Sequence, residues 1–376
     1  MEPLGVGIIG CGSIAGTYLD LIPSFRGLRV VACADLDPAA AEARAAAYGL
    51  RALPVEALLA DPSVQVVVNL TVPAAHHGVS AAALRAGRHV WSEKPLVLSL
   101  DDGLALRDLA AERGLRLGSA PDTFMGAAAA AARAAIDDGR TGRIVAGSAA
   151  VMSHGMEHWH PNPGFFFQPG GGPMLDLGPY YIATLIHLIG PVRRVAALAS
   201  APSSTRRITS RPRAGEVIPV GTPTNIHALL EFEGGATVTL STSWDVWAHR
   251  RAHLELYGEE GSVFLPDPNF FGGTAEIAGR DGCARPLDDA GHPFAVANQT
   301  HDDGPKANWR GAGLADMAAA IREGRGHRAS LDRALHGVEV MLAILQSGEE
   351  GRFVALRTTC TRPDPMTPEA ARALLA

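Results

Sequence analysis

Short hydrophobic runs alternate with alanine-rich segments through the first third of the chain. The runs VGIIG, LRVVACAD, VQVVVNLTV, RHVWSE and LRLGSA are rich in valine, isoleucine and leucine, and they lack a polar face. Strands of this kind are typical of a parallel sheet that helices cover on both faces. We therefore predict an α/β domain over residues 1–122.

The segments between these runs have helical character. Four of them are predicted helices: SIAGTYLDLI, PAAAEARAAAY, AAHHGVSAAALRAG and LDDGLALRDLAAERG. The last one also carries end signals, because Ser99 can cap its N-terminus and Gly114 can end it. Asp101 and Asp102 add negative charge to its first turn, where the helix dipole favours it.

The pattern changes near Pro121, and residues 123–376 form a second predicted domain. After a helix at 127–139, two segments alternate apolar and polar residues around glycine-containing turns, at 225–244 and 251–266. Such hairpins predict an antiparallel sheet with one covered face. Residues 201–223 are predicted as a surface loop, and 330–351 as an amphipathic helix.

Composition and charge exclude several classes of protein. Hydrophobic residues make up 47% of the chain and charged residues 19%, which allows a sizeable core. The net charge of −6 and the absence of a dense basic run argue against nucleic-acid binding. No apolar run reaches the roughly 18 residues of a membrane span. The four cysteines are scattered, which argues against a disulfide framework, and we expect a soluble cytoplasmic protein.

A glycine motif, GCGSIA at residues 10–15, follows the first predicted strand and opens a helix. Gly10 permits a tight turn, Gly12 lets the backbone approach a pyrophosphate, and Ala15 allows close packing of helix on strand. The helix N-terminus then offers N–H groups to the phosphates. The predicted dinucleotide-binding residues here are Gly10, Gly12, Ser13 and Ile14.

Asp35 ends the second strand, at the spacing of about 20 residues expected for a ribose-binding acid. Its carboxylate can accept hydrogen bonds from both ribose hydroxyls and would repel a 2′-phosphate. Leu36 supplies no compensating cation, so NAD is preferred to NADP. The alternative is a plain turn in which Asp35 caps the next helix.

Two further segments reach the carboxyl edge of the predicted sheet, where ligands of such folds bind. NLTVPAAHH places Thr71, Pro73 and His76 there, although His76 could also be a helix residue without a role. WSEKP ends the next strand with Glu93 and Lys94. A Glu–Lys pair is usually a solvated surface pair, which is an unexpected end for a buried strand.

With GxGxxA, NLTVPAAHH and SEKP in this order, followed by GGGPMLDLGPYYIATLIHLIGPV, the chain resembles the Gfo/Idh/MocA family of oxidoreductases. The resemblance covers nearly the whole chain. It implies a Rossmann domain followed by an α/β domain with a large, open, mostly antiparallel sheet. It also implies a homo-oligomer, a dimer or tetramer, formed through that sheet.

The resemblance implies hydride transfer between a nicotinamide and a carbinol carbon of a sugar-like substrate. Lys94 matches the family's catalytic lysine, and the Lys94–Pro95 bond is often cis in relatives. Asp176 matches a family aspartate. The sequence departs from the family pattern at Tyr180, where histidine is commoner, and at Ala183, where many relatives carry aspartate. Some members have a tyrosine at this point, so the departure suggests a subclass.

The proton chemistry favours a pairing of these residues. A tyrosine side chain normally has a pKa of about 10, and a neighbouring ammonium such as Lys94 would favour its phenolate form. Asp176 and Tyr180 are four residues apart on a predicted helix and would share a face. Asp176 could orient Lys94 or bind a substrate hydroxyl. The simpler alternatives are aromatic packing for Tyr180, a dipole partner for Asp176 and a surface amine for Lys94.

The loop SHGMEHWHPNPGFFFQPGGG, residues 153–172, is predicted to line the sugar pocket. Trp159 could face the C–H side of a sugar, while hydroxyl groups would bind His160, Asn162 and Gln168. The alternative is a lid packed by its three phenylalanines. A metal site built from the loop's three histidines is disfavoured, because a Pro/Gly loop does not guarantee converging ligands. Arg310 could reach a substrate oxygen or cap an interface.

The sequence thus predicts an NAD-dependent oxidoreductase that acts on a sugar, glycoside or cyclitol. A rival reaction keeps the same cofactor and cleaves glycosides by transient oxidation and elimination, with His154, His158 or His160 as the additional base. A non-enzymatic rival is a nucleotide-sensing regulator that retains the Rossmann scaffold. The substrate, the oxidised carbon and the direction are not fixed by the sequence, because they depend on loop geometry.

Overall fold

A computed structural model describes residues 2–301 and 304–376 and divides the chain into two compact units. The first unit contains Met1–Ala127, Ala290–Leu335 and Pro363–Ala376, and the second contains Ala128–Asp289 and His336–Arg362. The first boundary lies close to the predicted one after residue 122. Two later segments return to the first unit. The second unit is therefore not the continuous domain 123–376 that the hydrophobic pattern predicted.

The first unit is built on a six-stranded parallel sheet in the order β3-β2-β1-β4-β5-β6. Its strands are β1 Leu4–Ile9, β2 Leu28–Ala34, β3 Arg51–Ala52, β4 Val66–Asn69, β5 His89–Ser92 and β6 Leu117–Ser119. The five predicted strands are confirmed, whereas two-residue β3 is too short to show a pattern. The strand order reverses between β1 and β4, which creates the crevice where open α/β sheets bind ligands.

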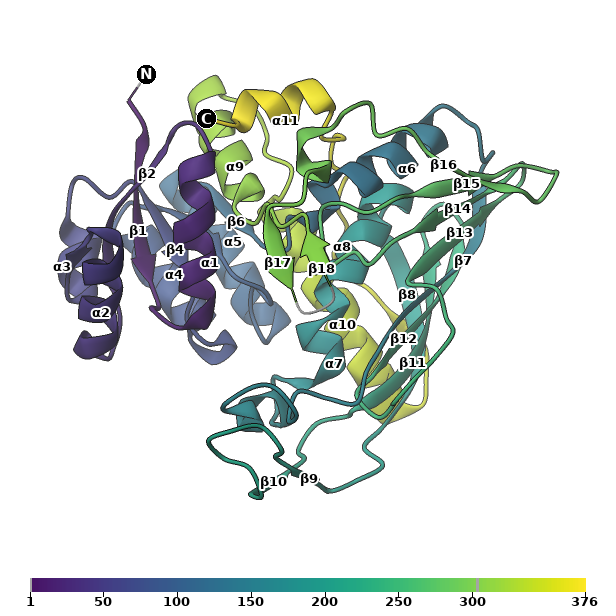
Figure 1. Cartoon of the computed structure of the whole chain (residues 1–376), viewed down its shortest axis with the longest axis horizontal. Coiled ribbons are helices and arrows are strands. Elements are labelled where there is room, and N and C mark those ends of the chain that lie inside the picture. Colours follow the sequence, from purple (N-terminus) through teal and green to yellow (C-terminus); the bar gives the residue numbers. More distant parts are fainter. Residues whose placement is uncertain (1, 302–303) are drawn as a thin grey trace. The chain divides into compact units, whose positions relative to one another are not determined.

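Helices flank this sheet, with α1 and α2 on the near side in Figure 1 and α4 and α5, drawn fainter, behind it. Their bounds are α1 Ser13–Leu21, α2 Pro38–Tyr48, α3 Val55–Ala60, α4 His76–Arg85 and α5 Leu100–Arg113. The predicted end signals of α5 are confirmed. The Ser99 hydroxyl accepts a hydrogen bond from the Asp102 N–H at 3.1 Å, and Gly114 adopts φ 63° at the C-cap. The short α3 was not predicted.

The returning segments complete the first unit. They supply β17 Gln299–His301, β18 Gly304–Lys306, α9 Ala312–Glu323 and α11 Pro368–Leu374. Ser330 bridges Gly118 of the edge strand β6. The buried carboxylate of Asp122 accepts hydrogen bonds from the N–H groups of Gly311 (3.0 Å) and Gly313 (2.9 Å), which satisfies donors at the start of α9. Residues remote in sequence are therefore held to the parallel sheet by a backbone bridge and by capping hydrogen bonds.

The second unit contains a nine-stranded sheet in the order β16-β15-β14-β13-β7-β12-β11-β8-β19. Its strands are β7 Ile144–Met152, β8 Val192–Ser200, β11 Asn225–Phe232, β12 Thr237–Ser243, β13 Leu254–Gly258, β14 Ser262–Leu265, β15 Glu276–Ala278, β16 Ala284–Pro286 and β19 Val354–Ala355. The pair β7–β12 is parallel, and the other described pairs are antiparallel. Both predicted hairpins, β11–β12 and β13–β14, are confirmed.

In Figure 1, helices of the second unit lie along one face of this sheet. They are α6 Ala127–Asp137, α7 Gly172–Asp176, α8 Gly178–Ile189 and α10 Leu331–Glu350. Alternation along β11 follows from this arrangement: Ile226, Ala228 and Leu230 are buried, while His227 and Leu229 point to the opposite, exposed face. The amphipathic pattern that predicted α10 is confirmed.

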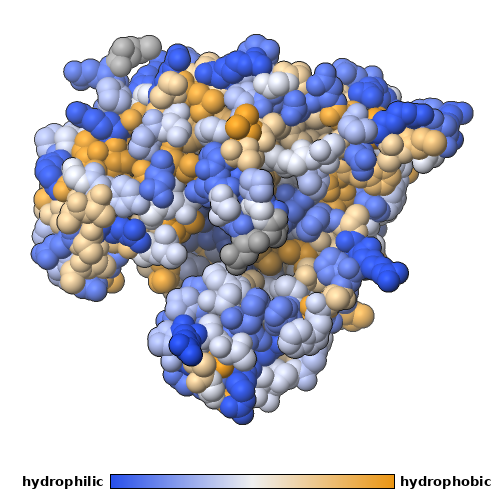
Figure 2. All heavy atoms as spheres, viewed as in Figure 1, coloured by the Kyte–Doolittle hydropathy of each residue, from blue (hydrophilic) through white to orange (hydrophobic). Residues whose placement is uncertain are grey.

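The predicted loop 201–223 contains a short hairpin, β9 Thr205–Arg207 paired with β10 Val217–Pro219. Together with residues 153–171 and 244–247 it forms what we call the loop lobe. This lobe has its own small core of Met156, Phe167, Ile208, Ile218 and Trp244. Its outward surface is largely hydrophilic in Figure 2. The hairpin was missed because its strands are short and mostly exposed, so neither shows a clear alternation.

His327, in the segment after α9, makes the first unit sensitive to acid. Burial lowers the pKa of His327 to about 4, and the nearby Asp316 only partly opposes this effect. The unfolded chain takes up a proton near pH 6.5 and the folded chain does so only near pH 4. The free energy of unfolding should therefore fall as pH decreases from 6.5 to 4, by about 3 kcal/mol in total. As the pH is lowered from about 7.5 to about 4.5, the melting temperature of the wild type should fall more than that of His327→Gln, so that the two curves converge. Parallel curves would contradict the low pKa of His327.

Candidate active site

The glycine motif has the geometry of a phosphate-binding turn. Gly10 has φ 103°, and a Cβ at this position would lie 2.6 Å from the carbonyl carbon of Leu70. Gly12, at the N-cap of α1, faces open space: a Cβ there would have no heavy atom of the described residues within 4 Å. Ala15 is fully buried, as close packing of α1 on the sheet requires. The turn therefore leaves room for a pyrophosphate at the start of the helix, which fits a dinucleotide.

Asp35 is fixed beside this turn. One of its carboxylate oxygens accepts a hydrogen bond from the Cys11 N–H at 2.7 Å, and the other accepts one from the Asp37 N–H at 3.0 Å. Asp37 is the residue that caps α2, through the Ala39 N–H, so the alternative role of Asp35 as a helix cap is wrong. The next side chain, Leu36, is 95% exposed.

Arg44 on α2 supports the turn, a role that the sequence did not reveal. Its guanidinium donates to the carbonyl oxygens of Cys11 at 3.2 Å and Gly12 at 3.0 Å. Two carbonyls of the turn are thereby tied to α2. No motif marks this residue, because the contact depends on how α2 packs beside the turn.

The end of β4 is organised by a buried amide that the sequence analysis did not single out. Asn69 accepts hydrogen bonds from the Thr71 N–H at 3.3 Å and the Thr71 hydroxyl at 2.7 Å. Its amide nitrogen donates to the His76 carbonyl at 3.0 Å and the Ser80 hydroxyl at 3.1 Å. The predicted cofactor residues Thr71, Pro73 and His76 thus belong to one turn that Asn69 closes onto α4.

His76 is almost completely buried, with 1% of its surface exposed. Its Nδ1 lies 2.6 Å from the Pro95 carbonyl oxygen, and its Nε2 lies 3.0 Å from the Thr71 carbonyl oxygen. Burial lowers the pKa of this imidazole, although both carbonyls favour its charged form. The side chain connects the loops after β4 and β5, so its contribution at this sheet edge is to position Thr71 and Pro95.

Glu93 explains why a charged pair follows a buried strand. Its Oε1 accepts a hydrogen bond from the Tyr18 hydroxyl at 2.9 Å, and its Oε2 accepts one from the Lys94 N–H at 2.9 Å. The Trp91 indole N–H donates to the same tyrosine hydroxyl at 3.1 Å. Burial, reinforced by Glu93, holds the pKa of Tyr18 well above its usual range. The Lys94–Pro95 bond is cis, as expected. The hydrogen bond from the Lys94 N–H to Glu93 holds the backbone of Lys94 at the carboxyl edge of the sheet.

Asp176 and Tyr180 do not lie on one continuous helix, contrary to the prediction. Asp176 ends α7, and α8 begins two residues later at Gly178. Pro179 accounts for the break, because it lacks the N–H that would donate to the Leu175 carbonyl in a continuous helix. Tyr180 is buried in the first turn of α8. The neighbouring Tyr181 is bound elsewhere, with its hydroxyl 2.9 Å from His253 Nδ1 and donating to Asp267 at 3.3 Å.

His160 is the predicted loop residue that the fold brings within electrostatic range of Asp176. Burial lowers the pKa of His160, whereas the Asp176 carboxylate acts in the opposite direction. The His160 Nδ1 accepts a hydrogen bond from the Asn162 N–H at 3.0 Å. Trp159, next to it, is 57% exposed. The exposed Trp159 indole lies against the His160 ring, with 5.3 Å between the ring centroids, and His160 is the member of this pair within electrostatic range of Asp176.

The remaining predicted substrate residues have partners within their own units. The Asn162 carbonyl oxygen accepts a hydrogen bond from Arg213, and the Gln168 amide donates to the Pro219 carbonyl at 3.1 Å. Both contacts join parts of the loop lobe. Arg310 belongs to the first unit, where it donates to Asn308 at 2.8 Å. Over the described residues there is no group of three or more His, Cys, Asp or Glu side chains that could hold a metal ion.

Comparison with known proteins identifies the class. Residues 4–120 match the family model described as "Oxidoreductase family, NAD-binding Rossmann fold", and residues 129–264 match the "GFO/IDH/MocA C-terminal domain". The chain is 30% identical to an inositol 2-dehydrogenase of Ralstonia nicotianae, over 70% of this chain and 74% of that protein. The chain therefore belongs to the GFO/IDH/MocA family of oxidoreductases, and its first domain binds NAD.

Two further relatives extend over almost the whole chain. An uncharacterized oxidoreductase, ORF334 of Rhizobium meliloti, is 29% identical over 94% of this chain and 99% of its own length. The structure of levoglucosan dehydrogenase in complex with NADH and levoglucosan matches with a TM-score of 0.80 at 20% identity, covering 95% of this chain and 100% of that one. At this identity the structural match concerns the fold. Among the helices of the described residues, none is long and apolar enough to cross a membrane.

Arg44 should matter for nucleotide affinity although it lies outside the glycine motif. Arg44→Ala removes two hydrogen bonds from a charged donor to the turn, and we expect the Kd for NADH to rise about tenfold. ADP-ribose should show the same loss, because the effect arises at the phosphates. Fluorescence titration of NADH measures it, with Arg51→Ala, an arginine paired with Asp61 at 2.7 Å, as the matched control. Equal affinities for the two variants would contradict the role.

Proposed function

We propose that the protein is an NAD-preferring dehydrogenase that transfers hydride between nicotinamide and a hydroxyl-bearing carbon of a sugar, glycoside or cyclitol. The observation that carries the proposal is the fixed Lys94 at the end of β5, held by Glu93 beside an NAD-binding turn. Several relatives support the substrate class by name, among them 1,5-anhydro-D-fructose reductase, levoglucosan dehydrogenase and D-xylose dehydrogenase.

The preference for NAD rests on charge at the adenosine end of the turn. Asp35 presents a carboxylate there, and exposed Leu36 adds no cation that could neutralise a 2′-phosphate. The guanidinium of Arg44 is already engaged by two backbone carbonyls. The Asp35 carboxylate would repel a 2′-phosphate, whereas ribose hydroxyls can donate to its remaining lone pairs.

Three side chains would carry the proton chemistry. When bound, the nicotinamide ring supplies the hydride acceptor. The ammonium of Lys94 would favour the phenolate form of Tyr180, and this phenolate would take the proton of the substrate hydroxyl as hydride leaves the carbon, becoming a neutral phenol. Asp176 would orient the substrate or Lys94, with His160 in its electrostatic field. In the reverse direction Tyr180 returns the proton to the nascent alkoxide.

Substrate contacts would come from Trp159 and His160, which present their rings from the loop lobe, and from Arg310 of the first unit. Asn162 and Gln168 would act by holding the lobe, since their side chains bind Arg213 and Pro219. Glycoside cleavage by transient oxidation is the rival reaction. It is distinguished by turnover of a glycoside without net formation of NADH.

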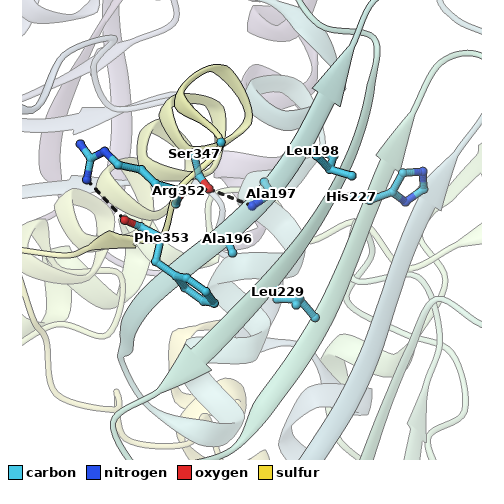
Figure 3. A pocket seen from close by; sticks show the side chains of 9 residues that line it. Ala196, Ala197, Leu198, His227, Leu229, Ser347, Arg352 and Phe353 are labelled. Carbon is cyan, nitrogen blue, oxygen red and sulfur yellow. Dashed lines mark hydrogen bonds between the residues drawn. The ribbon is translucent and has the colours of Figure 1, made fainter.

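The homo-oligomer would form through the exposed face of the nine-stranded sheet. Figure 3 shows an apolar groove on this face, between β8, β11 and the segment after α10, with a cavity volume of about 340 Å³. The large side chains that line it are well exposed: Leu198 is 76%, Phe353 56% and Leu229 52% accessible. Glu231, paired with Arg193 and Arg194, adds a polar border. An apolar centre with a charged border is the pattern of an interface, and a second copy is the occupant we propose.

If Lys94 and Tyr180 are catalytic, replacing them should lower the turnover rate and leave the affinity for NADH almost unchanged. In a screen of sugars and cyclitols with NAD, Lys94→Met and Tyr180→Phe should lower kcat by about 10²- to 10⁴-fold. The Kd for NADH should change little, and His77→Gln, beside but outside the site, should behave as the wild type. NADPH should bind more weakly than NADH. Failure of the wild-type protein to bind either NADH or NADPH would contradict the proposed function.

If the groove forms the proposed interface between two copies, a charged side chain placed in it should prevent oligomer formation. Leu198→Asp and Leu229→Asp would bury a carboxylate at the centre of the proposed contact, which is costly unless it is paired. We expect sedimentation to show a monomer for these variants and a larger species for the wild type. Val217→Asp, at a residue 53% exposed on the loop lobe, is the control. A wild-type monomer, or variants that assemble like the wild type, would exclude this face.

A further inference from the structure

Three aromatic rings of the second unit form a stack that the proposed reaction does not use. The rings of His154 and Trp247 lie 4.4 Å apart with 11° between their planes. On the histidine side the stack continues to His158, whose ring centroid is 4.1 Å from that of His154. Trp247 ends the stack and is 84% exposed, so His154 supports its indole while most of its surface meets solvent.

The backbone that carries this ring stack is anchored. The Ser153 N–H donates to the Ser243 carbonyl at 2.9 Å, and the Val246 N–H donates to the Ser153 carbonyl at 2.9 Å, which extends the β7–β12 pairing beyond both strands. Asp245 is held in turn by the Thr224 hydroxyl at 2.7 Å and by Arg206. The chain that leads into Trp247 is therefore anchored, as is the residue before His154.

The ring stack adjoins the candidate substrate site. His158 and His160 are two residues apart, so their Cα atoms are separated by at most about 7 Å. The His160 N–H donates to the Met156 carbonyl at 3.0 Å, which holds it on the same turn as His158, and His160 lies within electrostatic range of Asp176. A molecule with one ring at His160 and Asp176 would therefore extend toward the stack if it carried a second ring.

We propose that the ring stack of Trp247, His154 and His158 is a subsite for the second ring of a glycoside, either an aglycone or a neighbouring sugar. This inference rests on the proposed function and narrows its substrate class from free monosaccharides to glycosides. A flat, supported and exposed indole offers a face to the C–H side of a sugar or to an aryl ring. Stacking requires no charge on the ligand, which suits a neutral glycoside.

The experiment compares one-ring and two-ring ligands by calorimetry, in the presence of NADH so that no turnover occurs. The probes are methyl and 4-nitrophenyl glycosides of glucose, galactose and xylose. For at least one sugar, the 4-nitrophenyl glycoside should bind the wild type roughly five- to tenfold more tightly than its methyl counterpart. Trp247→Ala should abolish this gain, whereas Trp247→Phe, which retains a flat ring, should keep most of it. Affinity for the methyl glycoside should be the same in all three proteins.

Several outcomes would overturn the subsite. They are equal affinity of the wild type for both ligand series, no binding of either series, a gain that survives in Trp247→Ala, and binding of free 4-nitrophenol as tight as that of its glycoside. The proposed function is judged separately by NADH affinity and by oxidation of monosaccharides and cyclitols. An active dehydrogenase without the two-ring gain would therefore retain the function and lose the subsite.

Discussion

The buried carboxylate of Glu93 is the constraint on which the first unit's reactive edge depends. It is placed where a parallel strand ends, and burial of a charge is costly unless hydrogen bonds compensate for it. Tyr18 from α1 and the Lys94 N–H supply that compensation, and Trp91 completes the chain by donating to Tyr18. A side chain from the helix of the glycine turn is thereby tied to the backbone of the proposed catalytic lysine.

The neighbouring strand ends are joined by the same kind of interaction. Asn69 closes the turn after β4, His76 links that turn to Pro95, and Arg44 ties the glycine turn to α2. Each contact uses a buried or half-buried polar group that satisfies backbone atoms left over where strands stop. Loops at the carboxyl edge of a parallel sheet are therefore held as a set, which gives a bound dinucleotide a preorganised surface.

The second unit has three distinct surfaces: the helix-covered face of its sheet, the exposed face of that sheet, and the loop lobe. Helices bury one face, the other presents the apolar groove around Leu198 and Leu229, and the loop lobe packs around its own core. The backbone of this lobe is held by the ion pair of Arg206 with Asp245 and by the continued β7–β12 pairing. The exposed rings of Trp159 and Trp247, for which we propose ligand contacts, thus lie on the lobe and outside the sheet.

The sequence by itself determined much of this protein. Apolar runs and helix signals located five strands of the first sheet, and the alternation at 225–244 and 251–266 located two hairpins, because these patterns follow from local burial. The ordered motifs identified the family and the NAD-binding turn, and they predicted a catalytic role for Lys94. Tertiary structure decided the rest. The return of 290–335 to the first unit, the contacts of Arg44 and Asn69, and the break between Asp176 and Tyr180 all depend on packing between residues distant in sequence or on a single proline, which no periodicity encodes.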